Sequence, residues 1–219
     1  MLGLGLDTPG TWLLPRPFSI GWRSERGLIG ILLRVFGRGT RALSALTPGE
    51  TALVLGPLGT EFEAAEGRTT ECVAGGVGLA PFVFLAAEEI AAGRPVRLVY
   101  GERDAEAVFD TDLLRELTDI DAEVFTEDGS RGTRGRVTAG LDPAADSVLC
   151  ACGPTPMLAA LARFAVEHDR DLQVSVEEHM GCGIGTCQGC VVRSSAGRWV
   201  KACVEGPVFR ATDLDWGAP

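Results

Sequence analysis

The sequence predicts a multi-domain protein of mixed β and α/β class, in which an antiparallel β domain precedes a parallel-sheet domain and a small third domain. Three observations support this. Residues 1–64 carry few helix signals, residues 65–172 alternate strands with helices, and residues 173–219 place short strands around a cysteine cluster. Alternating strands and helices favour a parallel sheet with right-handed crossovers.

The β character of the first region comes from two stretches. "GLIGILLRVF" at 27–36 is apolar and rich in residues that favour strands, and "TPGETALVLGPLGTEF" at 47–62 has the pattern turn, strand, turn. We therefore expect short antiparallel strands here.

The second region alternates regularly. Its expected strands are "TTECVAGG", "RPVRLVYG", "AEVFTEDG" and "DSVLCACG", and its expected helices are "PFVFLAAEEIAAG", "AVFDTDLLRELTD" and "TPMLAALARFAVEH". Pro81 opens the first helix and Gly93 ends it, which is the arrangement that helices prefer.

The third region contains the short strands "QVSVEE", "CVVRSS" and "RWVKACV". A segment of this size buries little core by itself. We expect a metal centre to supply the missing stabilisation.

Composition narrows the functional class. The chain has 219 residues, a net charge of −10 and 46% hydrophobic residues. The acidic balance argues against a nucleic-acid binder. No run of 18 apolar residues and no basic leader at the N-terminus are present, so we expect a cytoplasmic protein. Seven cysteines in that compartment indicate metal binding or redox chemistry rather than disulfides.

The segment "CGIGTCQGC" and one later cysteine carry the strongest signal. Cys182, Cys187, Cys190 and Cys203 follow the pattern C-x4-C-x2-C-x12-C, whose first three members have the plant-type [2Fe-2S] spacing. Glycines at 183, 185 and 189 permit the tight backbone that such a loop requires, with backbone N–H groups aimed at the sulfurs. Zinc is the main alternative, although structural zinc sites favour two C-x2-C pairs. The other three cysteines, Cys72, Cys150 and Cys152, are expected in the core.

Two glycine corners indicate a nucleotide site. "AGGVGLAP" at 74–81 and "CACGPTPM" at 150–157 each follow an expected strand and open a helix. Backbone N–H groups at such corners can hold a pyrophosphate, and corners at the carboxyl ends of parallel strands form a crevice. "TEDGSRGTRG" at 126–135 lies at the same edge, as a third loop or a plain surface turn.

Together these motifs resemble a known family. "RPFS", "GRGT", "GGVGLAP", "VYGERD", "CGPTPML" and "EEHMGCGIGTCQGCVV" with "KACVEGPVF" are similar to the electron-transfer subunits of NAD-dependent dihydroorotate dehydrogenase, within the ferredoxin–NADP reductase superfamily. The resemblance covers about residues 12–210. It implies an FAD-binding β-barrel at 1–64, an NAD-binding domain at 65–172 and a [2Fe-2S] domain at 173–219. Family members carry further strands before "RPFS", so we expect a shortened barrel with open edges.

The resemblance also implies residue roles. The four cluster ligands would be Cys182, Cys187, Cys190 and Cys203, and the nicotinamide nucleotide would meet Gly76, Gly78, Cys152 and Gly153. The positions that match the flavin site are Arg16, Pro17, Phe18, Ser19, Leu32, Leu33, Arg34, Gly39 and Thr40. Arg16 and the Gly39–Thr40 turn suit the flavin phosphates as a cation and backbone donors.

The implied function is electron transfer in pyrimidine biosynthesis. Electrons from dihydroorotate would reach FMN in a catalytic partner subunit and pass through the cluster and FAD to NAD+, in a heterotetramer of two plus two subunits. No catalytic acid or base is expected on this chain. The sequence does not decide whether the nucleotide is NAD or NADP. Arg103 suits the 2′-phosphate of NADP, whereas Glu102 or Asp104 suits the free 2′-hydroxyl of NAD. The resemblance favours NAD.

Two other interpretations remain. The first is a related flavin and iron–sulfur reductase subunit that serves another partner, such as a hydrogenase or a sulfide-dependent reductase. The second is a non-enzymatic, zinc-bound binding module.

Overall fold

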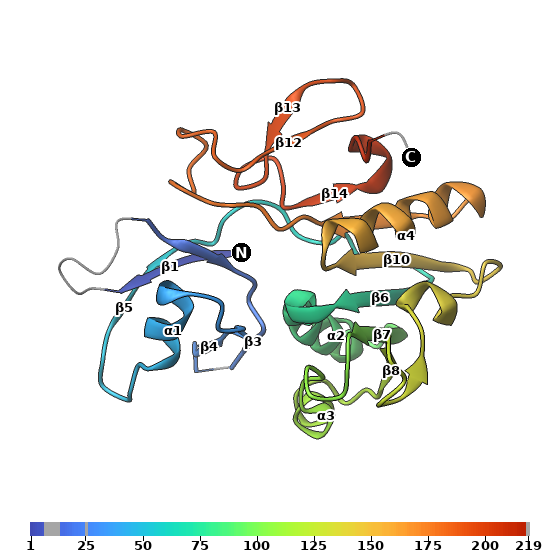
Figure 1. Ribbon diagram of the computed structural model, residues 1–219, viewed down its shortest axis with the longest axis horizontal. Helices are drawn as coiled ribbons and strands as arrows, with labels where there is room; N and C mark the ends of the chain where they lie inside the picture. Colours follow the sequence, from blue (N-terminus) through green and yellow to red (C-terminus); the bar gives the residue numbers. More distant parts are fainter. Residues whose placement is uncertain (7–13, 25, 218–219) are drawn as a thin grey trace.

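The computed structural model describes residues 1–6, 14–24 and 26–217. Figure 1 shows three parts: small antiparallel sheets on the left, a large sheet flanked by helices on the right, and the C-terminal hairpin with its loops at the top. Within the described residues no helix has the length and apolar character needed to cross a bilayer.

The first part is antiparallel, as predicted. Three strands form one sheet in the order β2–β1–β5, and two form a hairpin; the bounds are β1 Leu2–Leu6, β2 Arg16–Phe18, β5 Ala52–Leu55, β3 Trp22–Arg23 and β4 Ile29–Gly30. A small core holds Leu2 and Leu4 of β1 against Leu43. β5 is an edge strand with all four residues exposed, so the expected open edge is present.

A short helix, α1 Arg38–Ser44, was not predicted from the sequence. The glycines of "GRGT" resemble a turn. The Thr40 hydroxyl nevertheless closes the helix start, because it accepts hydrogen bonds from the backbone N–H groups of Phe36 at 2.9 Å and Gly37 at 3.2 Å. Burial of Leu43 then holds the helix on β1.

The stretch 27–36 is less regular than expected. Only Ile29–Gly30 forms a strand. Ile31 and Leu33 still pack into the first core while Leu32 packs against the large sheet's core, so the period-two pattern is kept. Because no partner strand lies beside these residues in the described structure, the predicted strand does not continue.

The large sheet has seven strands in the order β14–β11–β10–β6–β7–β8–β9. Every pairing is parallel except that of β14. The strands are β6 Thr69–Gly75, β7 Val96–Glu102, β8 Ala122–Thr126, β9 Thr133–Arg134, β10 Ser147–Cys152, β11 Leu172–Ser175 and β14 Val208–Arg210. The predicted parallel sheet is therefore confirmed.

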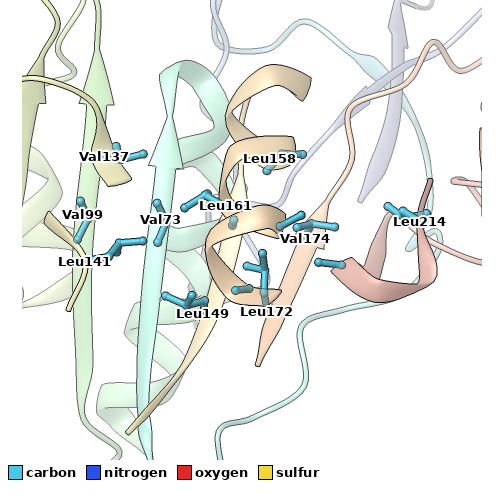
Figure 2. Packing of buried hydrophobic residues seen from close by; sticks show 14 of the residues in the cluster. Val73, Val99, Val137, Leu141, Leu149, Leu158, Leu161, Leu172, Val174 and Leu214 are labelled. Carbon is cyan, nitrogen blue, oxygen red and sulfur yellow. The ribbon is translucent and has the colours of Figure 1, made fainter. Parts of the chain in front are cut away.

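Helices cover both faces of this sheet, and alternate residues of a strand point to opposite faces. Cys72 and Ala74 share a core with α2 Ala80–Ala91 and α3 Thr111–Thr118. Val73 lies in the opposite core with α4 Thr155–Glu167, which Figure 2 shows with Val99, Leu158 and Leu161 around it. Strands buried on both faces are typical of parallel sheets.

Capping sets where α3 begins. The pattern predicted a helix over 107–119, but α3 starts at Thr111 because the Asp110 carboxylate accepts from the N–H groups of Asp112 and Leu113 at 3.0 and 3.2 Å. Single 3₁₀ turns complete the α/β part and the C-terminal end: Gly76–Leu79, Val137–Gly140 and Ala211–Asp213.

The C-terminal segment divides its strands between two sheets. β12 Val191–Arg193 and β13 Trp199–Lys201 form a separate hairpin, whereas β11 and β14 belong to the large sheet. A small core of Met180, Cys190, Ala202 and Cys203 lies beneath the hairpin. The three-domain division stays a prediction, and the large sheet extends past residue 173.

Candidate functional site

The cysteine loop runs from the end of β11 to the start of β12 without regular secondary structure. Gly183 and Gly185 take the positive φ values of +74° and +79° that the sequence suggested. Gly189 does not; Gln188, with φ +56°, makes the corresponding turn. A β-carbon on Gly183 would lie 3.0 Å from Leu55 Cδ2, so the loop packs closely against β5 of the first part.

Backbone donors point at the loop sulfurs, as predicted. The N–H groups of Thr186 and Cys187 lie 3.3 and 3.4 Å from Cys182 Sγ, and the N–H of Gly189 lies 3.4 Å from Cys187 Sγ. Hydrogen bonds from the backbone of Cys187, and then of Ile184, lower the pKa of Cys182 to about 6. The loop therefore favours the thiolate of Cys182, the form in which sulfur binds metals.

The four cysteines lie in two places. Cys187 donates its backbone N–H to Cys182 Sγ on the loop, whereas Cys190 and Cys203 share the small C-terminal core. The latter two are buried, and burial followed by the neighbouring Cys190 thiol raises the pKa of Cys203 to about 11. Across the described chain, no three His, Cys, Asp or Glu side chains converge on a single-ion site.

This arrangement of the cysteines suits a [2Fe-2S] cluster better than a single zinc ion. A [2Fe-2S] cluster takes four cysteines, two on each iron, whereas structural zinc needs four donors around one point. The four cysteines, with backbone N–H donors at Cys182 and Cys187, therefore fit the two-iron centre.

The two glycine corners meet at the switch point of the large sheet. β6 and β10 are neighbours, and the later strands extend in opposite directions from them, which is where doubly wound sheets bind ligands. A β-carbon on Gly78 would lie 2.3 Å from the Cys152 carbonyl oxygen, and one on Gly153 would lie 3.0 Å from Gly75 Cα. The structure thus brings the turn after β6 and the corner after β10 into contact.

The carboxylate of Glu177 also lies beside the corner after β10. Its Oε1 lies 4.0 Å from Cys152 Sγ, at the carboxyl end of β11 beside β10. Burial raises the pKa of Glu177 and that of Cys152. The available signal was its position, as a charged residue two positions after a fully buried strand at the edge that carries the glycine corners.

Arg16 and the Gly39–Thr40 turn also come together. Arg16 lies on β2, and a β-carbon on Gly39 would stand 2.6 Å from its Nε, so the guanidinium rests on the first turn of α1. Arg16 Nη1 also donates to the Leu14 carbonyl at 2.7 Å. A fixed cation on small, glycine-lined backbone fits a phosphate group.

The remaining flavin-site predictions are dispersed. Pro17 pairs with Gly3 within the sheet, Phe18 packs into the first core, and Ser19 follows β2. Leu32 and Leu33 pack into different cores.

The Arg34 side chain reaches the large sheet. It forms an ion pair with Glu102 and donates to the Ala107 carbonyl at 3.2 Å. The Glu102 carboxylate, buried and also bonded to the Tyr100 hydroxyl at 3.0 Å, is therefore engaged in the free protein. Asp104 caps Ala107 N–H at 3.0 Å, while Arg103 is exposed.

Known proteins similar to this chain share its cysteine loop and most of its length. A family model described as the iron-sulfur cluster binding domain of dihydroorotate dehydrogenase B matches residues 177–215. A protein of Geobacillus sp. (strain WCH70), named dihydroorotate dehydrogenase B (NAD(+)), electron transfer subunit, is 42% identical over 211 residues, covering 92% of this chain and 80% of the relative. An Aquifex aeolicus homologue of that subunit is 39% identical over 176 residues, or 80% of this chain and 69% of the relative.

Solved structures share the fold. The structure of an NADH-dependent reduced ferredoxin–NADP oxidoreductase, studied for flavin-based electron bifurcation, superposes with a TM-score of 0.84 at 31% identity, covering 98% of this chain and 78% of that one. The ferredoxin reductase of carbazole 1,9a-dioxygenase, at 23% identity, has a TM-score of 0.64 over 77% of this chain and 56% of its own, which supports the fold alone.

Proposed function

This chain belongs to the family of electron transfer subunits of NAD-dependent dihydroorotate dehydrogenase B, and from this we propose that it carries electrons from a dihydroorotate-oxidising partner subunit to NAD+. The partner would contain FMN, and two copies of each subunit would form the assembly. When bound, the [2Fe-2S] cluster supplies one-electron transfer and FAD exchanges single electrons for a hydride.

The observation that carries the proposal is a cysteine loop whose backbone N–H groups donate to sulfur. Cys182, Cys187, Cys190 and Cys203 would hold the cluster, the first pair near solvent and the second in the small C-terminal core. N–H donors and the partly exposed position would stabilise the reduced, more negative state. The exposed half of the loop would face the partner.

The chain's own residues would also hold the two nucleotides. Arg16 with Gly39 and Thr40 would neutralise the flavin phosphates. Gly76 and Gly78 would bring backbone N–H groups close to the NAD pyrophosphate, and Cys152 with Gly153 would line the neighbouring corner.

Purification of the chain alone and with its partner tests the proposal. The chain alone should contain iron, acid-labile sulfide and flavin, and should pass electrons from NADH to an artificial acceptor without oxidising dihydroorotate. Dihydroorotate oxidation should require the co-expressed FMN subunit. Turnover of dihydroorotate by this chain alone would contradict the assignment.

One observation supports a second candidate, a related reductase subunit with a different partner. The oxidoreductase studied for electron bifurcation is 31% identical and matches nearly the whole chain. Affinity purification from the native cell distinguishes the two: a dihydroorotate-oxidising FMN protein supports the first proposal, and a hydrogenase or another redox partner supports the second.

We also propose a cytoplasmic location. All seven cysteines are free thiols, including three in the core of the large sheet, as expected in a reducing compartment. Cell fractionation would check it.

A further inference from the structure

Arg34 crosses from the first part of the chain to the large sheet. It follows the β3–β4 hairpin in sequence, yet both hydrogen bonds that its guanidinium makes within the described residues reach residues beyond β6. Both use Nη2, which contacts the Glu102 carboxylate and the Ala107 carbonyl. One end of the guanidinium is therefore fixed by the large sheet.

The acceptor for Arg34 is itself held rigidly. The Glu102 side chain is 3% exposed and lies at the carboxyl end of β7. The Tyr100 hydroxyl donates to it at 3.0 Å and accepts from the Phe109 N–H at 3.3 Å. Tyr100 is fully buried, so the carboxylate that orients Arg34 has little freedom to move.

The other end of the guanidinium faces the glycine turn after β6. A β-carbon on Gly76 would lie 3.8 Å from Arg34 Nη1 and 3.9 Å from Glu102 Oε1, which is ordinary contact distance. Gly76 has a φ of +60°, and the Arg34 side chain is 37% exposed. A positive charge therefore stands beside the turn with part of its surface open.

We propose that Arg34, supplied by the flavin-binding part, binds the pyrophosphate of the nicotinamide dinucleotide at the Gly76–Gly78 turn. This inference rests on the proposed function, because it concerns the same nucleotide site. Arginine suits the role because its planar fork can keep one nitrogen on Glu102 while the other reaches a phosphate oxygen. The cation that holds the dinucleotide would thus come from the part of the chain that holds the flavin, and would link the two nucleotides.

The test must avoid leaving a buried carboxylate unpaired, which by itself is strongly destabilising. The informative comparison is therefore the double variant Arg34→Ala/Glu102→Gln against Glu102→Gln alone. A glutamine at 102 still accepts from Tyr100, and only the guanidinium differs between the two proteins. Arg193→Ala is the charge control, since Arg193 pairs with Asp215 on the exposed side of β12.

Binding is measured on the full chain with its cofactors, using ADP-ribose, which contains the pyrophosphate, and adenosine, which lacks it. We expect the double variant to bind ADP-ribose about tenfold more weakly than Glu102→Gln, as for a lost charge-assisted contact, with adenosine binding unchanged. Arg34→Lys should be intermediate, because one ammonium cannot serve both Glu102 and phosphate. Arg193→Ala should match the wild type.

Either of two results would overturn the role of Arg34 and leave the proposed function standing. One is equal ADP-ribose affinity in the double variant and in Glu102→Gln; the other is an equal loss of affinity for ADP-ribose and for adenosine in the double variant. The second would make Arg34 a structural contact between the two parts. Wild-type protein that binds neither ligand would overturn the proposed function as well, so the two failures are distinguishable.

Discussion

The large sheet and the cysteine loop place the same residue type in opposite environments. Cys72 and Cys150 are neighbours on β6 and β10, nearly inaccessible to solvent, and burial raises the pKa of each. Cys182, on the loop, has its pKa lowered by backbone N–H groups instead. The surroundings, and not the cysteine itself, therefore decide between a packing residue and a metal ligand.

The two regions also differ in what stabilises them. The sheet buries apolar side chains on both faces in two extensive cores. The loop region has only a small core around Met180 and two of its own cysteines. We therefore expect the sheet to hold its structure alone and the loop to depend on its metal.

We expect the largest effect when a cysteine that would hold the cluster is replaced, in contrast to a cysteine in the core of the large sheet. Cys190→Ala should abolish the cluster's visible absorbance and its iron content, because the cluster would lose one of its four thiolates. Cys72→Ala, a small change in the sheet core, should retain both and cost roughly 1–2 kcal/mol of stability. Equal cluster content in the two variants would contradict the division.

Removal of the metal should destabilise the cysteine loop and leave the large sheet folded. Lys201 is the only lysine in the chain, and it packs beside Gly185 of the loop and pairs with Glu205 at 3.4 Å. A lysine-specific protease thus cuts at one reporter site. After iron is chelated, cleavage should become about tenfold faster or more, while circular dichroism of the sheet stays unchanged. Unchanged cleavage would show that the loop is stable without metal.

The third prediction concerns the contact between the glycine corners. Gly78→Ala would place a methyl group 2.3 Å from the Cys152 carbonyl oxygen, in rigid backbone. We expect about 1–3 kcal/mol of destabilisation and about tenfold weaker binding of NAD+ by calorimetry. Gly67→Ala is the control, since its φ is +72° but nothing lies within 4 Å, so it carries backbone strain without a clash. If the control weakens binding equally, contact between the corners is not the cause.

The smallest effect probes a charge inside the sheet region. Glu89 is buried and accepts from Arg94 Nε and Thr70 Oγ1, each at 2.9 Å, and these hydrogen bonds, chiefly that from Arg94, lower its pKa. A depressed carboxyl pKa stabilises the fold above the unfolded-state pKa, and this stabilisation is lost as the pH falls through the folded-state value.

Glu89→Gln keeps an acceptor oxygen and loses only the charge, so it should cost about 0.5–1.5 kcal/mol at pH 7, and the difference from wild type should shrink below about pH 4. Urea unfolding at the two pH values measures it. A difference that is constant with pH would show that the charge of Glu89 contributes nothing.

Local signals were enough for much of this fold. The spacing of Cys182, Cys187 and Cys190 indicated the loop, and alternating patterns located the parallel strands and the helices α2 and α4. These features depend on residues close in sequence, where spacing fixes geometry. The same holds for the N–H groups that point at Cys182.

Long-range contacts could not be predicted. Three features depend on which segments become neighbours: the shared core of Cys190 and Cys203, the contact of Gly78 with Cys152, and the ion pair of Arg34 with Glu102. α1 was missed because a threonine hydroxyl, rather than an apolar pattern, closes its first turn. The strand expected after Gly30 failed because it has no partner within the described residues.

The most direct test of the central claim is a count of iron and acid-labile sulfide in the purified chain, with paramagnetic resonance after one-electron reduction. We expect two irons and two sulfides per chain, with a signal that disappears in Cys190→Ala. Zinc without sulfide, bound by these same four cysteines, would contradict it.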